Sequence, residues 1–429
     1  MASWRPIDLA SRALAALGAV LRRRRRPRSV VRHEASRHRP YFVPDVVEVP
    51  APPARRRALL LYLVEPFVLP EGDPAWLKHS NLGRARRIAQ ALAEHGYAVD
   101  VANSRDRRFG PEREYDLVIS DRASLRPEVD RRLGESTRVF LATSDNYVEH
   151  NRKLRLRHRR LEARRGYGVP VTRLYRESMP FLAGCAAIVA VGNRYTAQSW
   201  SDAFGGPIHR IDNHGLPGIE PALGAKDFAR AGRHFLHFAS RSQVQKGLDL
   251  LLEVFPRHPG LHLWVCSAFR GEPEFCRCYR RELFRTANVH PVGWIPVGGR
   301  RFRELTVRCA HVILPSCSEG QAGSVVQCMH AGLIPLVTRE AGIDSDGFGT
   351  TFRDDSIDEI ERGVLEAAAS PAALLRARAE ATLEAARAQY TEAALVANLY
   401  TILNDLRASG APRRGGEPPG ELHAARASG

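Results

Sequence analysis

The chain has 429 residues, of which 44% are hydrophobic and 26% are charged. This balance is typical of two or three globular domains with buried cores, and it excludes a chain that is disordered throughout. No run of 18 or more uncharged apolar residues occurs, so no transmembrane helix is expected. The positive charges follow the first apolar stretch instead of preceding it, which argues against a secretory signal. These features predict a cytoplasmic protein.

The first 57 residues carry most of the positive charge. Fourteen arginines against four acids give them +10 of the formal net charge of +17. Apolar residues recur at helical spacing over 9–21 and an arginine-rich run follows over 22–28, which is the pattern of an amphipathic helix on an anionic membrane surface. A disordered arginine-rich leader fits the same residues as well. The first alternative predicts that residues 7–28 hold the protein at the periphery of the inner membrane face.

Nucleic acid and metal ions are not expected partners. The chain after residue 57 is only mildly basic, and the arginine run is not interleaved with aromatic residues. The seven cysteines are odd in number and lie mostly in apolar segments, which fits a reducing compartment. Cys266, Cys276 and Cys278 suggest a metal cluster by their proximity, but without a Cys-x-x-Cys pair structural thiols are the stronger interpretation.

Strand and helix patterns alternate from residue 58 onward. The continuous apolar run at 58–64 is typical of a parallel strand buried on both faces, and further strand candidates follow it in two series. The first series is 58–64, 98–101, 116–120, 138–142, 186–191 and 208–211, and the second is 235–239, 261–266, 289–292, 312–314 and 334–337. Helical patterns lie at 82–95, 152–165, 248–255, 324–331 and 392–408. Two such series predict an α/β protein with two doubly wound, Rossmann-like domains that face a cleft.

A loop with two cations follows the first strand of the second series. Arg241 and Lys246 stand five residues apart, ahead of Gly247 and a leucine-rich helix. Open α/β sheets bind ligands at the carboxyl ends of their strands, where this loop is expected. A guanidinium offers paired donors to phosphate oxygens and an ammonium adds a compact charge. A phosphate site and a solvated cationic loop both fit this pattern, but Lys246 is one of only four lysines among 64 basic residues.

A turn of small residues follows the strand at 312–314. It reads Pro-Ser-Cys-Ser-Glu-Gly over 315–320, and a helix is expected to begin near Gly323 and Ser324. Free amides and the positive end of the helix dipole suit such a turn to an anion, and Gly320 and Gly323 allow close approach of the backbone. Glu319 either meets a ligand at the lip of this turn or is an ordinary acid at a helix start.

These segments resemble the retaining family 4 glycosyltransferases, which have the GT-B fold. The signature of that family is a Pro-Ser-x-x-Glu-Gly loop with a second Glu eight residues after the first, and an Arg and a Lys-Gly follow the first strand of the donor domain. This chain matches the loop at 315–320 and the cations at Arg241 and Lys246. Met-His-Ala-Gly-Leu-Ile-Pro at 329–335 and Asn-His-Gly at 213–215 are similar to further family segments. The resemblance covers 57–408 and is stronger in the second half.

The resemblance implies a role for each matching residue. Glu319 would be the catalytic residue that grips the hydroxyls of the transferred sugar. The expected ligands of the donor diphosphate are Arg241, Lys246, Gly323 and Ser324. The residues expected beside the donor nucleoside and sugar are Gln327, Gly293 and Gly320. Cations and amides aimed at the leaving diphosphate would stabilise the transition state without a divalent metal, so no cofactor is expected beyond the nucleotide sugar as co-substrate.

Two departures from the family pattern affect the expected site. Gln327 stands where the family has its second Glu, which accepts bonds from ribose hydroxyls, so donor affinity or base preference is expected to differ. The first half lacks the usual Gly-Gly turn and has His79 and Asn81 at a helix entrance, where they can meet the acceptor. His150 is a candidate for the catalytic-domain His of the family, and a surface His is the alternative.

The sequence as a whole predicts a retaining hexosyltransferase that moves a sugar from a nucleotide-diphosphate sugar to an acceptor hydroxyl of a glycan, polysaccharide or lipid-linked sugar. The alternatives are a non-catalytic GT-B protein that binds nucleotide sugars and a sugar-nucleotide epimerase of the same fold. The expected parts of the chain are a basic leader with an amphipathic helix (1–56), an N-terminal acceptor-side domain (57–213), a linker (214–230), a C-terminal donor domain (231–390), a closing helix (391–408) and a flexible tail (409–429).

Overall fold

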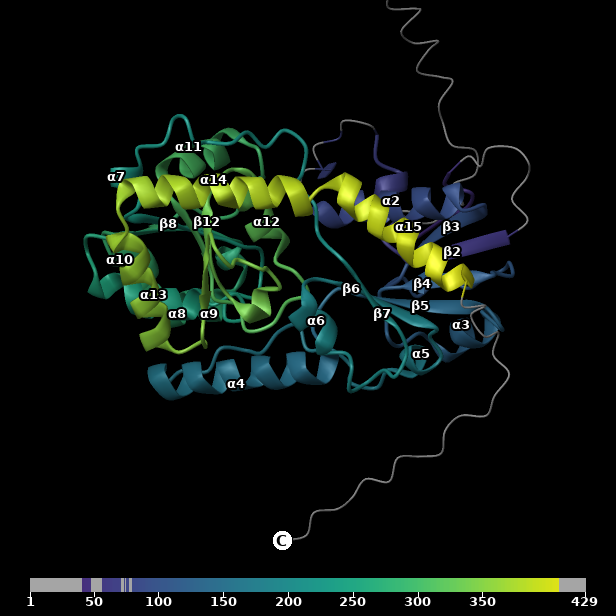
Figure 1. Ribbon diagram of the computed structural model, residues 1–429. Helices are drawn as coiled ribbons and strands as arrows, with labels where there is room; N and C mark the ends of the chain where they lie inside the picture. Colours follow the sequence, from purple (N-terminus) through teal and green to yellow (C-terminus); the bar gives the residue numbers. More distant parts are fainter. Residues whose placement is uncertain (1–40, 48–55, 71–72, 74, 77–78, 409–429) are drawn as a thin grey trace, which may run out of the picture.

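The computed structural model describes residues 41–47, 56–70, 73, 75–76 and 79–408. The amphipathic helix and arginine run of the leader, and the tail at 409–429, lie outside the described residues. The described chain forms two lobes, each built around one sheet with helices on its faces (Figure 1). The prediction of an α/β protein with two Rossmann-like domains is therefore confirmed.

The first lobe contains a seven-stranded sheet in the order β1-β3-β2-β4-β5-β6-β7. All neighbouring strands are parallel except β1, which pairs antiparallel with β3 at the edge. The strands are β1 (Phe42–Val43), β2 (Arg56–Tyr62), β3 (Tyr97–Asn103), β4 (Leu117–Ser120), β5 (Thr137–Ala142), β6 (Ala187–Val191) and β7 (Ile208–Ile211). Edge strand β1 lies inside the segment that the sequence analysis assigned to the leader. It was not predicted, because two residues are too few to show a periodic pattern.

The second lobe contains a six-stranded parallel sheet in the order β10-β9-β8-β11-β12-β13. Its strands are β8 (His234–Phe238), β9 (His262–Cys266), β10 (Val289–Pro291), β11 (His311–Leu314), β12 (Ile334–Thr338) and β13 (Thr350–Phe352). The strands follow one another outward from β8 to β10 on one side and outward from β11 to β13 on the other, so the strand order reverses between β8 and β11. Ligands of doubly wound sheets bind at this reversal, outside the carboxyl ends of the two central strands.

Helices cover both sheets. They are α2 (Ser80–Glu94), α3 (Pro127–Arg132), α4 (Tyr147–Arg165), α5 (Pro180–Ala183), α6 (Arg194–Gln198), α7 (Phe228–Ala231), α8 (Leu248–Val254), α9 (Pro273–Cys278), α10 (Arg280–Arg285), α11 (Arg300–Arg308), α12 (Gly323–His330), α13 (Ile357–Ala369), α14 (Ala372–Gln389) and α15 (Glu392–Ala408). In Figure 1, α14 lies over the second lobe and α15 returns to cover the first. Leu395 and Leu399 of α15 are buried in the core of the first lobe.

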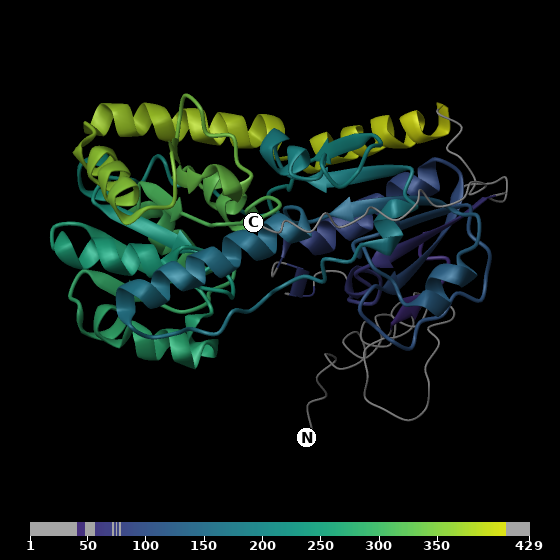
Figure 2. The ribbon, with the colours of Figure 1, turned by 90° about the horizontal axis from the view of Figure 1, so that it is seen from below.

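Helix α4 connects the two lobes in a way that its sequence did not reveal. It follows β5 of the first lobe and runs beneath the second lobe (Figures 1 and 2). Leu161, near its C-terminal end, is fully buried in the core of the second lobe. Arg157 is also buried, and its guanidinium contacts Asp249 at 3.4 Å and Asp355 at 2.9 Å. The helix begins at Tyr147 instead of near residue 152, because the Asn146 side chain caps it.

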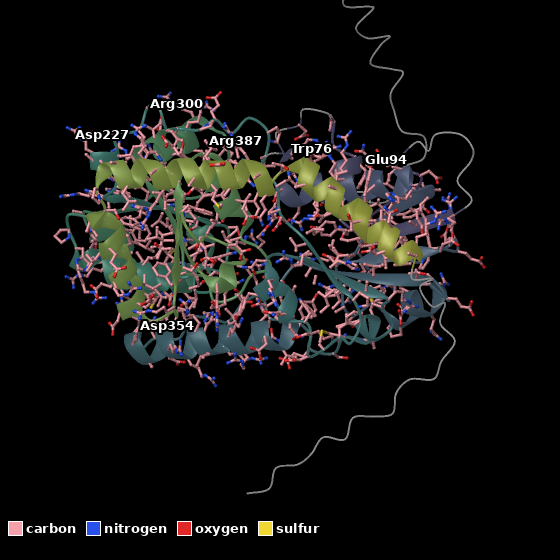
Figure 3. All side chains as sticks on the ribbon, in the orientation of Figure 1. Trp76, Glu94, Asp227, Arg300, Asp354 and Arg387 are labelled. Carbon is pink, nitrogen blue, oxygen red and sulfur yellow. The ribbon has the colours of Figure 1, made fainter. Side chains whose placement is uncertain are left out.

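Side chains fill the space between the sheets and their helices, and charged residues such as Asp227, Arg300 and Asp354 lie at the periphery (Figure 3). Within the described residues, no helix is both long enough and apolar enough to cross a bilayer.

Candidate functional site

Two loops meet at the reversal point of the second sheet. The loop after β8 contains residues 239–247 and the loop after β11 contains residues 315–322. They are joined by hydrogen bonds from the Cys317 amide to the Gln245 carbonyl (2.9 Å) and from the Gln245 side chain to the Ser318 carbonyl (2.6 Å). Gly247 adopts a left-handed φ of 76° against Pro315, so a side chain at this position would overlap the neighbouring loop. The two predicted ligand-binding segments therefore form one unit.

Lys246 and Glu319 are paired at the centre of this unit. The Lys246 ammonium donates a short hydrogen bond to Glu319 Oε1, which also accepts one from the Ser316 hydroxyl at 2.8 Å. Both side chains are about nine-tenths buried. Burial opposes ionisation of the carboxyl, but the charges of Lys246 and Arg173 and the two hydrogen bonds lower the pKa of Glu319 below its ordinary value. The carboxylate is therefore ionised, and Lys246 retains further N–H donors for an anion.

Arg241, the second predicted cation, is exposed at the start of the same loop. Its guanidinium makes no hydrogen bond or ion pair with another described residue. The next residue, Ser242, has a left-handed φ of 68°, and its amide donates to the carboxylate of Glu272 at 2.5 Å. The structure thus fixes the backbone beside Arg241 and leaves its side chain exposed, and a contact with a diphosphate stays a prediction.

The N-termini of helices α12 and α2 lie close together between the lobes. Gly323 and Ser324 form the first turn of α12, which has no side-chain cap. A Cβ on Gly323 would lie 3.2 Å from the hydroxyl of Ser80, the first residue of α2. Both helix dipoles therefore present their positive ends to the same region.

The first lobe adds His79, Asn81 and Arg84 to this region. His79 caps α2 by accepting a hydrogen bond from the Asn81 amide at 3.2 Å. Although His79 is exposed at one side, the protein around its ring and the charges of Arg84, Lys246 and Arg173 lower its pKa below the ordinary value, so it is neutral near pH 7. Arg84 is fully buried and donates to the hydroxyl of Tyr62 and to the side chains of Asn81 and Asn213. No described carboxylate pairs with Arg84, so its positive charge remains uncompensated.

Gly320 lies where the signature loop touches the first lobe. A Cβ on this residue would be 2.7 Å from the Thr143 backbone and 2.8 Å from the Val191 carbonyl, at the ends of β5 and β6. The Gly320 carbonyl accepts a 2.7 Å hydrogen bond from Thr196. Packing between the lobes therefore explains the glycine, and a contact with the donor sugar stays a prediction.

His150 is buried on α4 and bonded to the signature loop, so the alternative of a surface histidine is wrong. Its Nδ1 lies 2.8 Å from the Ser318 hydroxyl, and its Nε2 lies 2.9 Å from the Arg173 carbonyl and donates to it. Burial is the main cause that lowers the pKa of His150 to about 4. The neutral ring can accept from Ser318 at Nδ1, one residue before Glu319.

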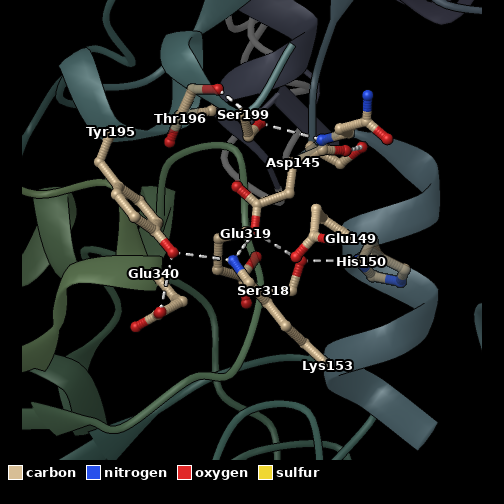
Figure 4. A network of polar contacts seen from close by, with 12 residues as sticks. Asp145, Glu149, His150, Lys153, Tyr195, Thr196, Ser199, Ser318, Glu319 and Glu340 are labelled. Carbon is tan, nitrogen blue, oxygen red and sulfur yellow. Dashed lines mark hydrogen bonds and ion pairs between the residues drawn. The ribbon is translucent and has the colours of Figure 1, made fainter. Parts of the chain in front are cut away.

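The network around Ser318 also contains a buried ion pair of the first lobe (Figure 4). Asp145 Oδ2 lies 3.1 Å from the Ser318 hydroxyl, whose single proton is shared between this carboxylate and His150 Nδ1, and 2.8 Å from the Lys153 ammonium. Burial raises the pKa of Asp145 to about 6. Lys153 also donates to Tyr195, whose hydroxyl donates to Glu340 of the second lobe at 3.0 Å. These contacts fix the signature loop against the first lobe.

Gln327 is committed to the interdomain linker. Its Oε1 accepts from the Leu216 amide at 2.7 Å and its Nε2 donates to the His214 carbonyl at 3.0 Å. The side chain is only 3% exposed, so contact with a nucleoside, which stays a prediction, would require these bonds to be shared or broken. A glutamate in this position lacks the donor that the His214 carbonyl requires.

The remaining predicted residues and groups are placed as follows. Gly293 follows β10 with a left-handed φ of 92°, and a Cβ there would be 3.9 Å from Arg270. All seven cysteines are free thiols. Among the described residues, no group of three or more His, Cys, Asp or Glu side chains is arranged to hold a metal ion.

The sequence did not identify Arg84, Asp145 and Arg173 as site residues. Lys153, one of the four lysines, carried a weak compositional signal. Arg84 and Asp145 carried none, because their importance arises from burial beside partners more than 100 residues away. Arg173 lies in an irregular segment whose path cannot be read from periodicity.

Comparison with known proteins agrees with this architecture. The sequence matches no protein-family model and no curated protein. A sucrose-phosphate synthase from Thermosynechococcus elongatus superposes with a TM-score of 0.58 and 13% identity, over 82% of this chain and all of that chain. HepE from Anabaena, in complex with UDP-glucose, superposes with a TM-score of 0.51 and 13% identity, over 83% of this chain and all of that one. The fold is GT-B. At these identities, the GT-B likeness establishes the architecture and leaves the activity to the site.

Proposed function

We propose that the protein is a glycosyltransferase that moves a sugar from a nucleotide-diphosphate sugar to an acceptor hydroxyl. The observation that carries this proposal is the Lys246–Glu319 pair at the reversal point of the second sheet. A cation and a sugar-binding carboxylate side by side suit a ligand that joins a diphosphate to a sugar. The uncompensated charge of Arg84 and the two helix N-termini add positive potential, which suits an anionic leaving group.

The proposed mechanism assigns separate roles to the paired residues. Departure of the diphosphate builds negative charge on its oxygens while the sugar becomes oxocarbenium-like, so the cations bind the transition state more tightly than the ground state. Lys246 would donate to the diphosphate, together with Arg241 and the amides of Gly323 and Ser324. Glu319 would accept from the sugar hydroxyls, and its ionised state suits this role. Retention of configuration and independence of metals are part of the proposal through the family resemblance.

The direct test is a donor panel of UDP-, GDP- and ADP-sugars with glycan and lipid-linked acceptors. Release of nucleoside diphosphate and formation of a glycosylated product are expected with one donor, and NMR of the product would show the anomeric configuration retained. Glu319→Gln should abolish transfer, whereas Glu384→Gln, on the exposed face of α14, should not. The proposal is refuted if the protein transfers sugar from none of these donors and also binds none of the nucleotides.

One observation favours a second candidate, a non-catalytic protein that binds nucleotide sugars. Gln327 replaces a family carboxylate and holds the linker. Binding of a nucleotide sugar without transfer or hydrolysis would support this alternative. An epimerase would instead convert the donor sugar without an acceptor, and mass-neutral conversion of donor alone would identify it.

We also propose that residues 7–28 bring the protein to an anionic membrane, where lipid-linked acceptors are found. The sequence of this stretch combines apolar spacing with an arginine run. Deletion of residues 1–40 should release the protein from anionic vesicles but not change nucleotide binding. Equal vesicle binding by both forms would contradict this role.

A further inference from the structure

The chain between α4 and α5 forms an irregular segment, residues 167–179, that runs back along α4 and is called the return segment below. Three buried side chains of α4 hold it. His158 bonds to the Val169 carbonyl at 2.9 Å, and His150 bonds to the Arg173 carbonyl at 2.9 Å. Asn151 bonds to both the amide and the carbonyl of Tyr175, at 2.9 and 2.8 Å. The path of this segment is therefore set by side chains of the helix.

The return segment lies beside the two loops of the candidate site. On one side, the hydroxyls of Thr172 and Ser242 are 3.5 Å apart, next to Arg241. On the other side, His150 joins the Arg173 carbonyl to Ser318, next to Glu319. Arg173 therefore lies next to the loop that carries Arg241 and is joined through His150 to the loop that carries Glu319, although it belongs to the first half of the chain.

The backbone at Arg173 is strained. Its φ is 63°, in the left-handed region where a non-glycine residue is unfavourable. Such strain persists where the surrounding structure imposes it, and it concentrates at ligand-binding and active sites. The guanidinium is exposed and makes no hydrogen bond or ion pair with another described residue. The side chains of α4 impose this backbone, but they give the guanidinium of Arg173 no partner among the described residues.

The charges around Arg173 indicate what it binds. Its positive charge acts on Lys246, Glu319, His79 and His150. Glu319 is the one acid of this group, and it is already paired with Lys246. The cations therefore repel one another, and an anion with several oxygens would relieve that repulsion.

We propose that Arg173 is a third cationic ligand of the donor diphosphate, delivered by the return segment from the first half of the chain. This inference rests on the proposed function. A guanidinium can bind two phosphate oxygens in parallel, which an ammonium cannot do, so Arg173 would complement Lys246 instead of duplicating it. An anionic group on the acceptor could use the same guanidinium, and the experiment below separates the two sources.

The test measures binding of nucleotides to the full chain by calorimetry. The probes are uridine, UMP and UDP, with the guanosine and adenosine series in parallel, and the series that wild type binds best is used. Arg173→Gln should weaken the nucleoside diphosphate by roughly 10-fold to 100-fold, because a hydrogen bond to a charged group is lost, and should leave the nucleoside unchanged. The affinity of Arg173→Lys for the nucleoside diphosphate should lie between those of wild type and Arg173→Gln. Arg176→Gln, exposed on the same segment, is the matched control and should bind as wild type.

A second variant separates binding from folding. Arg173→Gly removes the charge and the left-handed strain together, so it should melt at or above the wild-type temperature while losing the same affinity for diphosphate. Unchanged diphosphate affinity in Arg173→Gln and Arg173→Gly would overturn the assignment, and a raised acceptor KM in those variants would identify an acceptor anion instead. If wild type binds no nucleotide, the proposed function itself fails, and this inference fails with it.

Discussion

Replacing Gln327 with glutamate tests whether this residue serves the linker or the ligand. The family resemblance would make Gln327→Glu a restoration, with tighter binding of the ribose. The structure predicts damage instead, because the Nε2 donor to the His214 carbonyl is lost and a carboxylate oxygen is placed 3.0 Å from that carbonyl. The lost bond and the unsatisfied buried acceptor together should cost about 2–4 kcal/mol near neutral pH.

The assay for Gln327→Glu is thermal unfolding as a function of pH. The predicted destabilisation corresponds to a fall in melting temperature of roughly 4–16 °C for a lobe of this size. Burial raises the pKa of the new carboxyl, and its protonated form can donate to the carbonyl, so the loss should shrink as the pH falls toward 5. Gln198→Glu, on the exposed face of α6, is the matched control and should be neutral. An unchanged melting temperature with tighter nucleotide binding would refute the linker role.

Three further changes probe the contact between the lobes. Gly320→Ala should destabilise the protein by about 1–3 kcal/mol in chemical denaturation, because its Cβ would be 2.7 Å from the Thr143 backbone. The control Gly260→Ala meets no atom within 4 Å and should be neutral, and equal effects of the two substitutions would disprove the packing role of Gly320. Arg157→Met should cost about 1.5–3 kcal/mol, because the buried Asp249 carboxylate then keeps only Arg164 as a partner, and exposed Arg159→Met on the same helix should cost little. An unchanged free energy of unfolding in Arg157→Met would mean that this ion pair does not stabilise the contact between the lobes. The folded-state pKa of His150 is about 4 and its unfolded value is near 6.5. The neutral ring therefore contributes up to about 3 kcal/mol to stability above pH 6.5, and this contribution is lost as the pH falls through 4. His150→Asn should make the free energy of unfolding less dependent on pH in that window, and the same pH dependence as wild type would contradict the lowered pKa.

The sequence predicted two elements of different kinds with their full extent. The strand at 208–211 and the helix at 392–408 were predicted with the bounds that the structure has. The adjacency of Lys246 and Glu319 was also predictable, since the carboxyl ends of neighbouring parallel strands meet at one edge of a sheet.

The contacts between the lobes could not be predicted, because they depend on partners far apart in the chain. Helix α4 has a charged sequence typical of a solvated surface, yet Arg157 is buried against acids of the second lobe. Gln327 had the position of a ribose ligand, and only the path of the linker reveals its hydrogen bonds. Gly320 suggested close approach of a ligand, whereas the backbone of the first lobe accounts for it.

The central claim is that Lys246 and its neighbours bind a nucleotide-linked diphosphate between the lobes. Calorimetric titration of UDP, GDP and ADP into wild type and Lys246→Met tests it most directly, with Glu319→Gln/Lys246→Met as the control for the stranded carboxylate. Wild type should bind one of these nucleotides, and both Lys246 variants should bind it roughly 10-fold to 100-fold more weakly. Equal affinity in all three proteins, or no binding of any nucleotide by wild type, would contradict the account.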